Sequence, residues 1–354
     1  MPSLFDVDAW NRRFGNGSQI VYAFRRFRTR WLKQSWSFED SLAELPPEVR
    51  SVVQAEANPH PLTLTDRLQS EKDGATKLLF RTDQGLKIES VILRAETGRT
   101  SLCISSQVGC AAACRFCATG QMGIARNLTT EQILDQVVQA NELLKAEDRR
   151  VRNIVFMGMG EPLHNPANLH QALAALTSPW NFAYAPQRLL VSTVGVPAEM
   201  LRLDAAFPQV KLALSLHSAD QQVRQELIPL AKSVPLEKLR ETLLQLRLSD
   251  RRHIMIEYLT LAGQTDRDED AERIIGFLDG IPAHINLIPY NSIDGADHLR
   301  GSDQAARERL GRRLREAGFT VTIRYSLGAD IAAACGQLIQ RENRQIAIQL
   351  RTTS

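Results

Sequence analysis

The sequence predicts an α/β fold whose strands run parallel. From residue 76 onward, short apolar runs rich in β-branched residues alternate with amphipathic stretches of helical period. This alternation is typical of βαβ units, which place their strands in parallel. A chain of 354 residues, 44% hydrophobic and 23% charged, fits one large globular domain with an appendage, and no internal repeat interrupts it. A doubly wound sheet and a barrel of parallel strands both stay open at this point.

Each expected strand is a short apolar run bounded by polar or turn-forming residues. In chain order, the strand candidates are residues 76–81, 86–93, 101–105, 152–158, 188–194, 210–216, 253–259, 284–290 and 320–325. Helices are expected at 129–145, 166–176, 233–248, 268–279, 303–317 and 328–341. The clearest is 129–145, because Thr129 and Gln132 fit a capping box and Ile133, Val137, Ala140 and Leu144 share one face.

Composition divides the chain into three expected parts. Residues 1–74 are helix-like and irregular, with tryptophans and arginines interleaved and a proline-rich break at "ANPHPLT", and we expect a separate accessory domain there. The α/β core is expected at 75–340. Residues 341–354 are polar and are expected to form a loose tail.

The charge balance alone does not indicate a nucleic-acid-binding protein, because the net charge is only +3. Two arginine-rich runs, "RRFRTR" at 25–30 and "RRVR" at 149–152, fit either a solvated face or a phosphate-contacting patch. No stretch approaches the ~20 apolar residues of a membrane span, and the start lacks the layout of a signal peptide. We therefore expect a cytoplasmic protein without a membrane partner, whose thiols are kept reduced.

Four of the five cysteines lie within residues 103–117, and three of them form the pattern C-x3-C-x2-C: Cys110, Cys114 and Cys117. A structural zinc site normally needs four ligands, and no nearby histidine supplies the fourth. Three thiolates on a four-iron cubane leave one iron open to a substrate, which is typical of radical S-adenosylmethionine (SAM) enzymes. Phe116, an aromatic residue before the third cysteine, is also usual there. A zinc knuckle or unrelated buried thiols are the alternatives.

Small polar groups follow several of the expected strands. The segment "MGMGEPL" ends one strand with glycines and with Glu161, which could hold an ammonium group. Ser192, Ser215, His217 and Asn291 end other strands. Because sites of parallel barrels lie at the carboxyl ends of strands, these groups predict a ligand site around the cysteine motif.

The sequence closely resembles the radical SAM RNA methyltransferases of the RlmN/Cfr type, which methylate an aromatic carbon of adenine. The resemblance runs from about Glu89 to Leu338 and rests on "CISSQVGCAAACRFCATG", "FMGMGEPL", "STVG", "SLH", "PYN" and "AACGQL". It implies a partial (β/α)6 radical SAM barrel with a small helical N-terminal accessory domain, and the helical, basic content of residues 1–74 suits the docking of RNA. It also implies a 4Fe-4S cluster on Cys110, Cys114 and Cys117, and SAM contacts from Gly160, Glu161, Ser192, Ser215, Leu216, His217 and Asn291.

The resemblance also gives roles to the two cysteines outside the motif. An adenine ring carbon flanked by nitrogens is too electron-poor to attack the methyl group of SAM. In the family the methyl group therefore passes first to a thiolate, here Cys335, and a second SAM supplies the radical that activates it. Glu89 is implied to be the base, and Cys103 to release the product by forming a transient disulfide bond with Cys335. Without the family, packing alone would be the simpler interpretation of Cys335 on its expected helix.

The expected substrate is RNA, with 23S rRNA favoured over tRNA, and the expected electron donor is a flavodoxin or ferredoxin. Glu89 lies 14 residues before Cys103, and Leu327 stands where the carbon-2 branch usually carries arginine. Both features favour the Cfr-like side of the family, whose members methylate carbon 8. The alternatives are carbon-2 methylation of tRNA, another radical SAM reaction such as activation of a protein radical, and a non-catalytic cluster-containing RNA-binding or ribosome-assembly protein.

Overall fold

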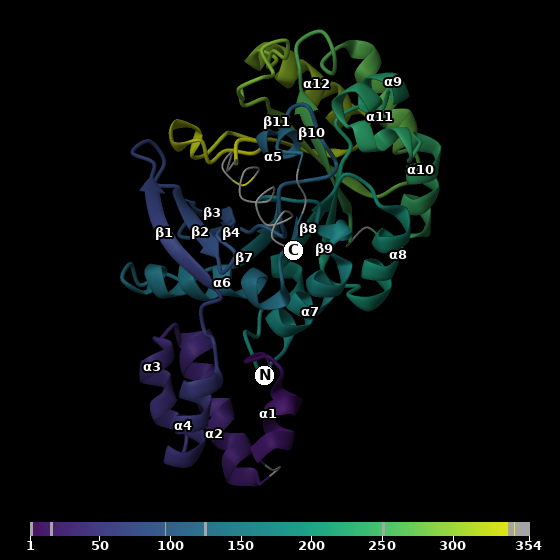
Figure 1. Cartoon of the computed structure of the whole chain (residues 1–354). Coiled ribbons are helices and arrows are strands. Elements are labelled where there is room, and N and C mark those ends of the chain that lie inside the picture. The colour runs from purple at the N-terminus through teal and green to yellow at the C-terminus, as the bar shows by residue number, and fades with distance from the viewer. Residues whose placement is uncertain are drawn as a thin grey trace, which may run out of the picture.

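The structure is a computed structural model that describes residues 3–14, 17–95, 97–123, 126–249, 252–338 and 343. Figure 1 shows two parts, a lobe of N-terminal helices and a larger α/β body that carries the rest of the chain. The tail expected at 341–354 lies outside the described residues apart from Asn343, whose side chain pairs with the backbone of Lys87.

One ten-stranded sheet forms the body, and its first four strands are antiparallel: β1 (Leu62–Gln69), β2 (Thr76–Thr82), β3 (Lys87–Arg94) and β4 (Thr100–Cys103). The remaining strands of this sheet follow β4 in chain order, and each pairs in parallel with the one before it. They are β7 (Asn153–Phe156), β8 (Leu189–Thr193), β9 (Lys211–Ser215), β10 (Ile254–Thr260), β11 (Ala283–Pro289) and β12 (Thr320–Ile323). Within the described chain β1 and β12 are the two ends of the sheet and do not pair, so the predicted partial barrel is confirmed. β5 (Gln107–Val108) and β6 (Arg126–Asn127) form a separate two-stranded antiparallel sheet.

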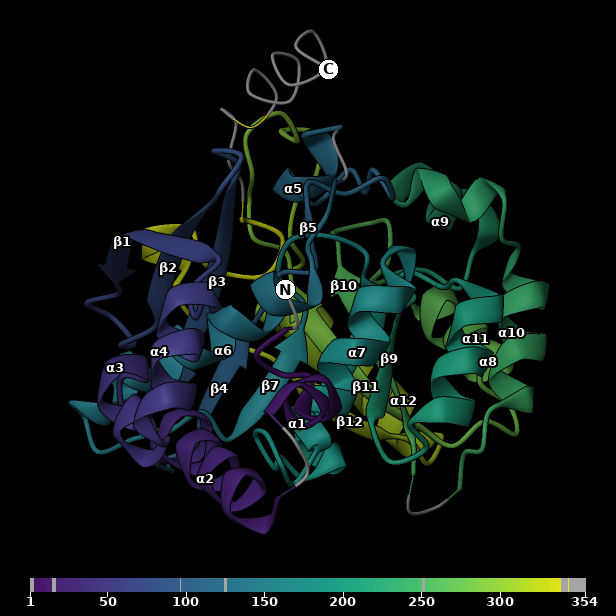
Figure 2. The same ribbon diagram turned by 60° about the horizontal axis from the view of Figure 1, so that its bottom comes forward.

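Helices connect the parallel strands, and Figure 2 shows several of them along the outer side of the sheet. They are α6 (Thr130–Lys145), α7 (Pro166–Thr177), α8 (Pro197–Ala206), α9 (Gln221–Leu227), α10 (Leu236–Gln245), α11 (Asp268–Phe277) and α12 (Gln304–Glu316), with the short α5 (Ala118–Gln121) after the cysteine motif. The predicted capping box of α6 is present, since the Gln132 N–H donates to Thr129 Oγ1 at 3.3 Å and the Thr129 N–H to Gln132 Oε1 at 3.1 Å. Short helical turns cover Leu42–Glu44, Pro162–His164, Pro186–Arg188, Pro229–Lys232 and Ala329–Ile331.

All nine expected strands are present, whereas one expected helix is wrong. The segment 328–338 forms only the turn Ala329–Ile331, because Gly328 and Ala332 adopt left-handed backbone conformations that end any helix. Cys335 therefore lies on a loop. The sequence analysis also missed helices α8 and α9 and the edge strand β1, which lies inside the segment expected to be helical.

The N-terminal lobe contains α1 (Val7–Phe14), α2 (Ser18–Arg28), a π-helical turn (Thr29–Lys33), α3 (Phe38–Ser41) and α4 (Pro47–Glu56). Aromatic rings fill its interior, with Phe27 and Trp31 centroids 5.8 Å apart and Phe38 edge-on to both. The Arg150 guanidinium joins the lobe to the body by donating to the Leu32 carbonyl at 3.1 Å. None of the helices in the described part of the chain has the length and hydrophobicity needed to cross a bilayer.

Candidate active site

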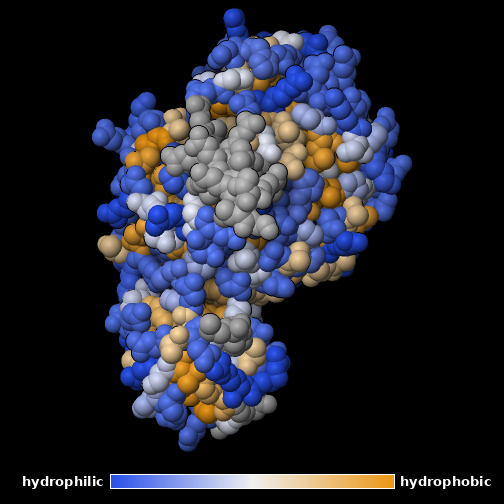
Figure 3. Space-filling model, viewed as in Figure 1, coloured by the Kyte–Doolittle hydropathy of each residue, from blue (hydrophilic) through white to orange (hydrophobic). Residues whose placement is uncertain are grey.

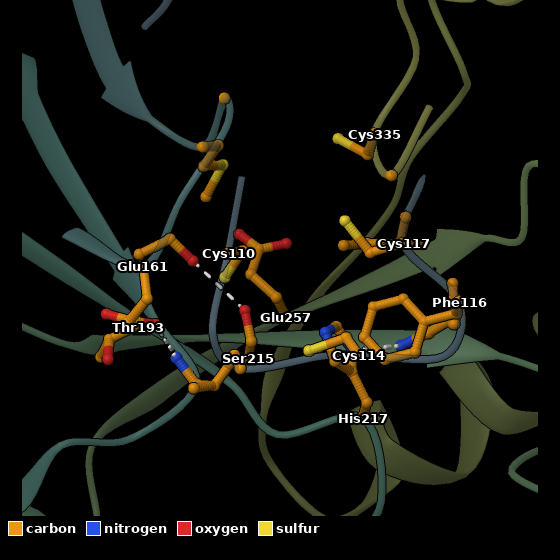
Figure 4. A pocket seen from close by; sticks show the side chains of 18 of the residues that line it. Cys110, Cys114, Phe116, Cys117, Glu161, Thr193, Ser215, His217, Glu257 and Cys335 are labelled. Atoms are coloured by element: carbon orange, nitrogen blue, oxygen red, sulfur yellow. Dashed lines mark hydrogen bonds between the residues drawn. The ribbon is translucent and has the colours of Figure 1, made fainter. Parts of the chain in front are cut away.

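The carboxyl ends of the parallel strands surround one cavity, which we call the cluster cavity. Its walls come from the cysteine motif, from the ends of β7 to β11 and from the loop that carries Cys335, and it encloses about 940 Å³ of space, part of it open to solvent. Figure 4 shows Cys117 and Cys335 on one side and Glu161 and Thr193 on the other. The sequence-predicted residues on this wall are Cys110, Cys114, Cys117, Gly160, Glu161, Ser192, Ser215, His217, Asn291 and Cys335.

The cysteine motif is held in its shape by backbone contacts. The Arg115 N–H donates to the Leu227 carbonyl at 2.9 Å, and the Ala118 N–H donates to the Gly336 carbonyl at 2.7 Å. Gly120 lies so close to the loop that a Cβ there would be 2.7 Å from both the backbone nitrogen and oxygen of Cys114. The motif therefore depends on α5 and on the Cys335 loop for its position.

The three motif thiols fit an iron–sulfur cluster. Burial raises the pKa of Cys110 to about 12 and also raises the pKa of Cys114, and the neighbouring motif thiols add to both rises. Without a bound cation the motif cysteines therefore favour the neutral thiol over the thiolate. A positively charged iron–sulfur cluster would stabilise the thiolate forms instead. Among the described residues, no three Cys, His, Asp or Glu side chains are placed to hold a single metal ion.

Glu161 is fixed after β7 by three hydrogen bonds, two to its carboxylate and one from its backbone N–H. Its carboxylate accepts from the N–H of Leu163 at 2.9 Å and of Val194 at 2.8 Å, while its own N–H donates to Gln107 Oε1 at 2.8 Å. Burial raises the pKa of Glu161 to about 7, against these hydrogen bonds. The carboxylate therefore ties the β7 and β8 loops together as well as facing the cavity.

His217 presents a neutral ring to the same cavity. Its Nδ1 accepts the Leu259 N–H at 3.1 Å, so the remaining ring proton sits on Nε2. Burial lowers the pKa of His217 to about 3, and the ring packs edge-on against Phe116 with centroids 4.6 Å apart. Nearby, the hydroxyls of Ser192 and Ser215 lie 3.3 Å apart and bring the ends of β8 and β9 together.

A second cavity, the thiol cavity, adjoins the first and brings Cys103 and Cys335 onto one wall. The two cavities share Cys117, Met157, Gly158, Ile288, Asn291, Arg324, Cys335 and Gly336. All five cysteines are unpaired in the structure. Although solvent reaches Cys335, desolvation by the surrounding protein raises its pKa, and Arg324 opposes this rise. The two thiols that the resemblance pairs in chemistry thus lie on the same cavity, 232 residues apart in the chain (335 minus 103).

Three sequence-predicted residues sit differently from the rest. Glu89 lines neither cavity; it is buried in β3 with its carboxylate 3.5 Å from Lys77 Nζ, two residues from the cavity-lining Val91 on the same face of the strand. Leu216 is fully buried and its N–H donates to the Glu257 carbonyl at 3.1 Å. Asn291 lies on the wall, but its amide donates to the Cys335 carbonyl at 3.1 Å, so it also positions that loop.

Two charged residues on the wall of the cluster cavity were missed in the sequence. The Glu257 carboxylate, in β10, accepts from Asn286 Nδ2 at 2.9 Å and lies 3.7 Å from the Arg324 guanidinium. Its second oxygen, Oε2, is buried and has no hydrogen-bond partner within the described residues. The signal that could have found them is a charged residue inside an apolar run, in "HIMIEYL" and "TVTIRY".

Comparison with known proteins agrees with this geometry. Residues 104–278 match the Radical SAM superfamily. A probable RNA methyltransferase of Rhodopirellula baltica is 53% identical over 93% of this chain and 86% of its own length. The dual-specificity RNA methyltransferase RlmN of Geobacter sulfurreducens is 40% identical over 92% and 87%.

A solved structure shares the whole architecture. The crystal structure of a radical SAM methyltransferase from Sphaerobacter thermophilus has a TM-score of 0.87 and 34% identity, and covers 96% of this chain and 99% of that one. The cysteine motif lies at the carboxyl end of a partial parallel barrel, and the relatives are similar along almost the entire chain. This protein therefore belongs to the RlmN-type RNA methyltransferase family of the radical SAM superfamily.

Proposed function

We propose that this protein methylates a ring carbon of adenine in RNA by way of a methylated Cys335. The observation that carries the proposal is the position of Cys103 and Cys335 on one cavity that adjoins the cysteine motif. Radical SAM chemistry alone would explain the motif, whereas it would leave this thiol pair without a use. The family implies SAM and a 4Fe-4S cluster as cofactors, and we propose two SAM molecules per turnover, one as methyl donor and one as radical source.

In this reaction we assign a separate role to each group of site residues. Cys110, Cys114 and Cys117 would hold a 4Fe-4S cluster, which would supply the electron for the cleavage of SAM. Gly160, Glu161, Ser192, Ser215, Leu216, His217 and Asn291 contact SAM. Cys335 accepts the methyl group as a thiolate, and this methyl group loses one hydrogen atom to the SAM-derived radical before its carbon bonds to the adenine. The adduct gives up one electron, which the oxidised cluster would take back, and Glu89 removes the ring proton. Cys103 then attacks Cys335 Sγ, so that a transient disulfide forms while the bond from Sγ to the product carbon breaks and leaves its electron pair on the product.

We further propose that the N-terminal lobe contacts the RNA. A groove on its surface is lined by Tyr22, Arg25, Arg26, Arg30 and Trp36 among others. The Arg30 guanidinium lies over the Trp36 ring at 4.3 Å. Exposed aromatic rings and arginines in one groove suit stacking on bases and contact with phosphates. Figure 3 shows hydrophobic patches among strongly hydrophilic residues on this lobe.

The two arginine-rich runs contribute to this surface only in part. Arg28 is buried and donates to the Leu4 carbonyl at 3.4 Å, so it serves the fold of the lobe. Arg26 and Arg30 both pair with Glu44, which reduces the charge they offer to a phosphate. The second run meets the lobe through Arg150, which lies beside Leu32 and Phe182.

The substrate that we propose is 23S rRNA, with a flavodoxin or ferredoxin as electron donor and the cytoplasm as the compartment. Leu327 lines the thiol cavity, where an adenine would be presented to Cys335. Our preference for carbon 8 over carbon 2 rests on the sequence, in which Leu327 replaces the arginine that is usual in the carbon-2 branch and Glu89 lies 14 residues before Cys103.

The test is nucleoside mass spectrometry of RNA from cells with the gene, without it, and with a Cys335→Ala copy. We expect a C-methyladenosine in ribosomal RNA that is present only with the unaltered gene. An unchanged methylation pattern in all three strains would contradict the proposal. The same modification found only in tRNA would keep the reaction and correct the substrate.

A further inference from the structure

The connection from β12 to Cys335 carries two exposed hydrophobic side chains at the edge of the thiol cavity. Tyr325 is 85% exposed and Leu327 is 37% exposed, and both line that cavity. Tyr325 is the most exposed of the large hydrophobic residues in the described chain. These two side chains are not isolated surface residues, because they line the same cavity as Cys335, and exposed hydrophobic surface at a cavity can mark a ligand-binding site.

The exposure of Tyr325 is not the result of a loosely held loop. The Gly328 N–H donates to Asp73 Oδ2 at 2.7 Å, Lys77 Nζ donates to the Ala332 carbonyl at 3.2 Å, and Asn291 Nδ2 donates to the Cys335 carbonyl at 3.1 Å. These bonds attach the loop to the β1–β2 turn, to β2 and to the end of β11. The backbone between Tyr325 and Cys335 is therefore attached to the body at three points.

The thiol cavity has the chemistry of a site for a planar heterocycle. Its walls are largely apolar, with Val91, Leu93 and Ile288 among them, and its polar groups include the Arg324 guanidinium and the Asn291 amide. Small-ligand sites commonly combine apolar walls with a few polar groups that set orientation. Proteins that bind unpaired bases stack them on aromatic rings, and a base must leave its stack to reach a thiol in a cavity.

We propose that Tyr325 is the stacking residue for the adenine that is presented to Cys335, and that the thiol cavity receives this base. The proposal rests on the RNA-methylating function proposed above. It assigns Tyr325 to binding the RNA base alone, with no part in binding SAM or in transferring the methyl group to Cys335. Tyr325 is thus a positioning residue for the substrate.

The experiment separates the two half-reactions in the variants Tyr325→Ala, Tyr325→Phe and Tyr325→Trp. Leu244→Ala is the matched control, because Leu244 is a 52% exposed hydrophobic residue on α10, away from both cavities. The first measurement is methylation of Cys335 by SAM without RNA, followed by peptide mass spectrometry. The second is the KM for RNA in complete turnover.

We expect Tyr325→Ala to methylate Cys335 as the unaltered protein does and to raise the KM for RNA at least about tenfold, the usual effect of removing a stacking ring. Tyr325→Phe, Tyr325→Trp and Leu244→Ala should stay within about twofold, since each keeps a ring at position 325. An unchanged KM in Tyr325→Ala overturns the proposal. A loss of Cys335 methylation in Tyr325→Ala, or a Tyr325→Phe variant as weak as Tyr325→Ala, overturns it too.

A third measurement does not depend on the loaded enzyme. Ultraviolet cross-linking of the cluster-free protein to a short adenine-rich single-stranded RNA should label the peptide that contains Tyr325, and the label should be lost in Tyr325→Ala. Cross-links found only on the N-terminal lobe would overturn the proposal. A labelled Tyr325 peptide in a protein that methylates no RNA would instead refute the proposed function and leave base binding in place.

Discussion

Replacement of Gly160 by alanine is the sharpest test of how the β7 loop forms the site. Gly160 has φ +104°, and a Cβ built there would lie 2.5 Å from the Cβ of Gln107 and 2.8 Å from its backbone nitrogen. A left-handed conformation costs a non-glycine residue about 1–2 kcal/mol. Overpacking against neighbours that cannot move adds about 1–3 kcal/mol, so Gly160→Ala should lower the free energy of unfolding by about 2–5 kcal/mol.

The Gly160→Ala substitution should also disturb the position of Glu161. Gln107 Oε1 accepts the Glu161 N–H, so any displacement of Gln107 releases the backbone that holds the Glu161 carboxylate in the cluster cavity. We therefore expect weaker binding of S-adenosylhomocysteine by Gly160→Ala under conditions in which the variant is still folded. Urea unfolding followed by circular dichroism gives the stability, and calorimetric titration gives the affinity.

Gly276 provides the matched control for this substitution. It lies in α11 with an ordinary φ and with no atom within 4 Å of an added Cβ, so Gly276→Ala should raise stability by up to about 1 kcal/mol. It should leave ligand affinity unchanged. A Gly160→Ala protein as stable as the unaltered one, or equal losses in both variants, would refute the reasoning.

Three further predictions concern the cysteines and the loop that positions them. Anaerobic reconstitution should load about four irons and four sulfides per chain, and Cys114→Ala should lose this loading; full iron content in that variant would contradict the cluster assignment. Gly120→Ala should reduce iron loading by displacing the backbone of Cys114, while circular dichroism of the cluster-free protein stays native, and undiminished loading would show that α5 does not position the motif. Cys335→Ala should abolish methyl transfer but keep the cluster, whereas Cys103→Ala should accumulate RNA covalently attached to Cys335; normal turnover without an adduct in Cys103→Ala would exclude the releasing role.

The strands and the cysteine motif were predictable because their signals are local. Most of the parallel strands are buried by helices and neighbouring strands, so their apolar runs are visible in the sequence, whereas the edge strand β12 is only half-buried or exposed. The segment 328–341 was predicted as a helix because "ADIAAAC" is rich in alanine. Contacts from Asp73 and Lys77, more than 250 residues away, hold its described part in a loop instead. The edge strand β1 was missed because it is mostly exposed and polar.

The sequence predicted those residues of the site that belong to local motifs, and missed the contacts between segments far apart in the chain. The polar groups at the strand ends are each visible in the sequence, and parallel topology brings them together. The Glu257–Arg324 contact joins β10 to the end of β12, and no local sequence pattern predicts this contact. The shared cavity of Cys103 and Cys335 likewise depends on how the partial barrel places the end of β4 against the loop after β12, and the sequence indicated it only through resemblance to the family.

The most direct test of the central claim follows the hydrogens of the transferred methyl group. The purified, reconstituted protein is given reductant, unmodified ribosomal RNA and SAM that carries a fully deuterated methyl group, and the product nucleoside is analysed by mass spectrometry. Passage through a methylated Cys335 that loses one hydrogen atom to a radical predicts a methyl group on an adenine ring carbon that retains two of the three deuterons. A methyl group that keeps all three deuterons, or one attached to an adenine nitrogen, would contradict the account.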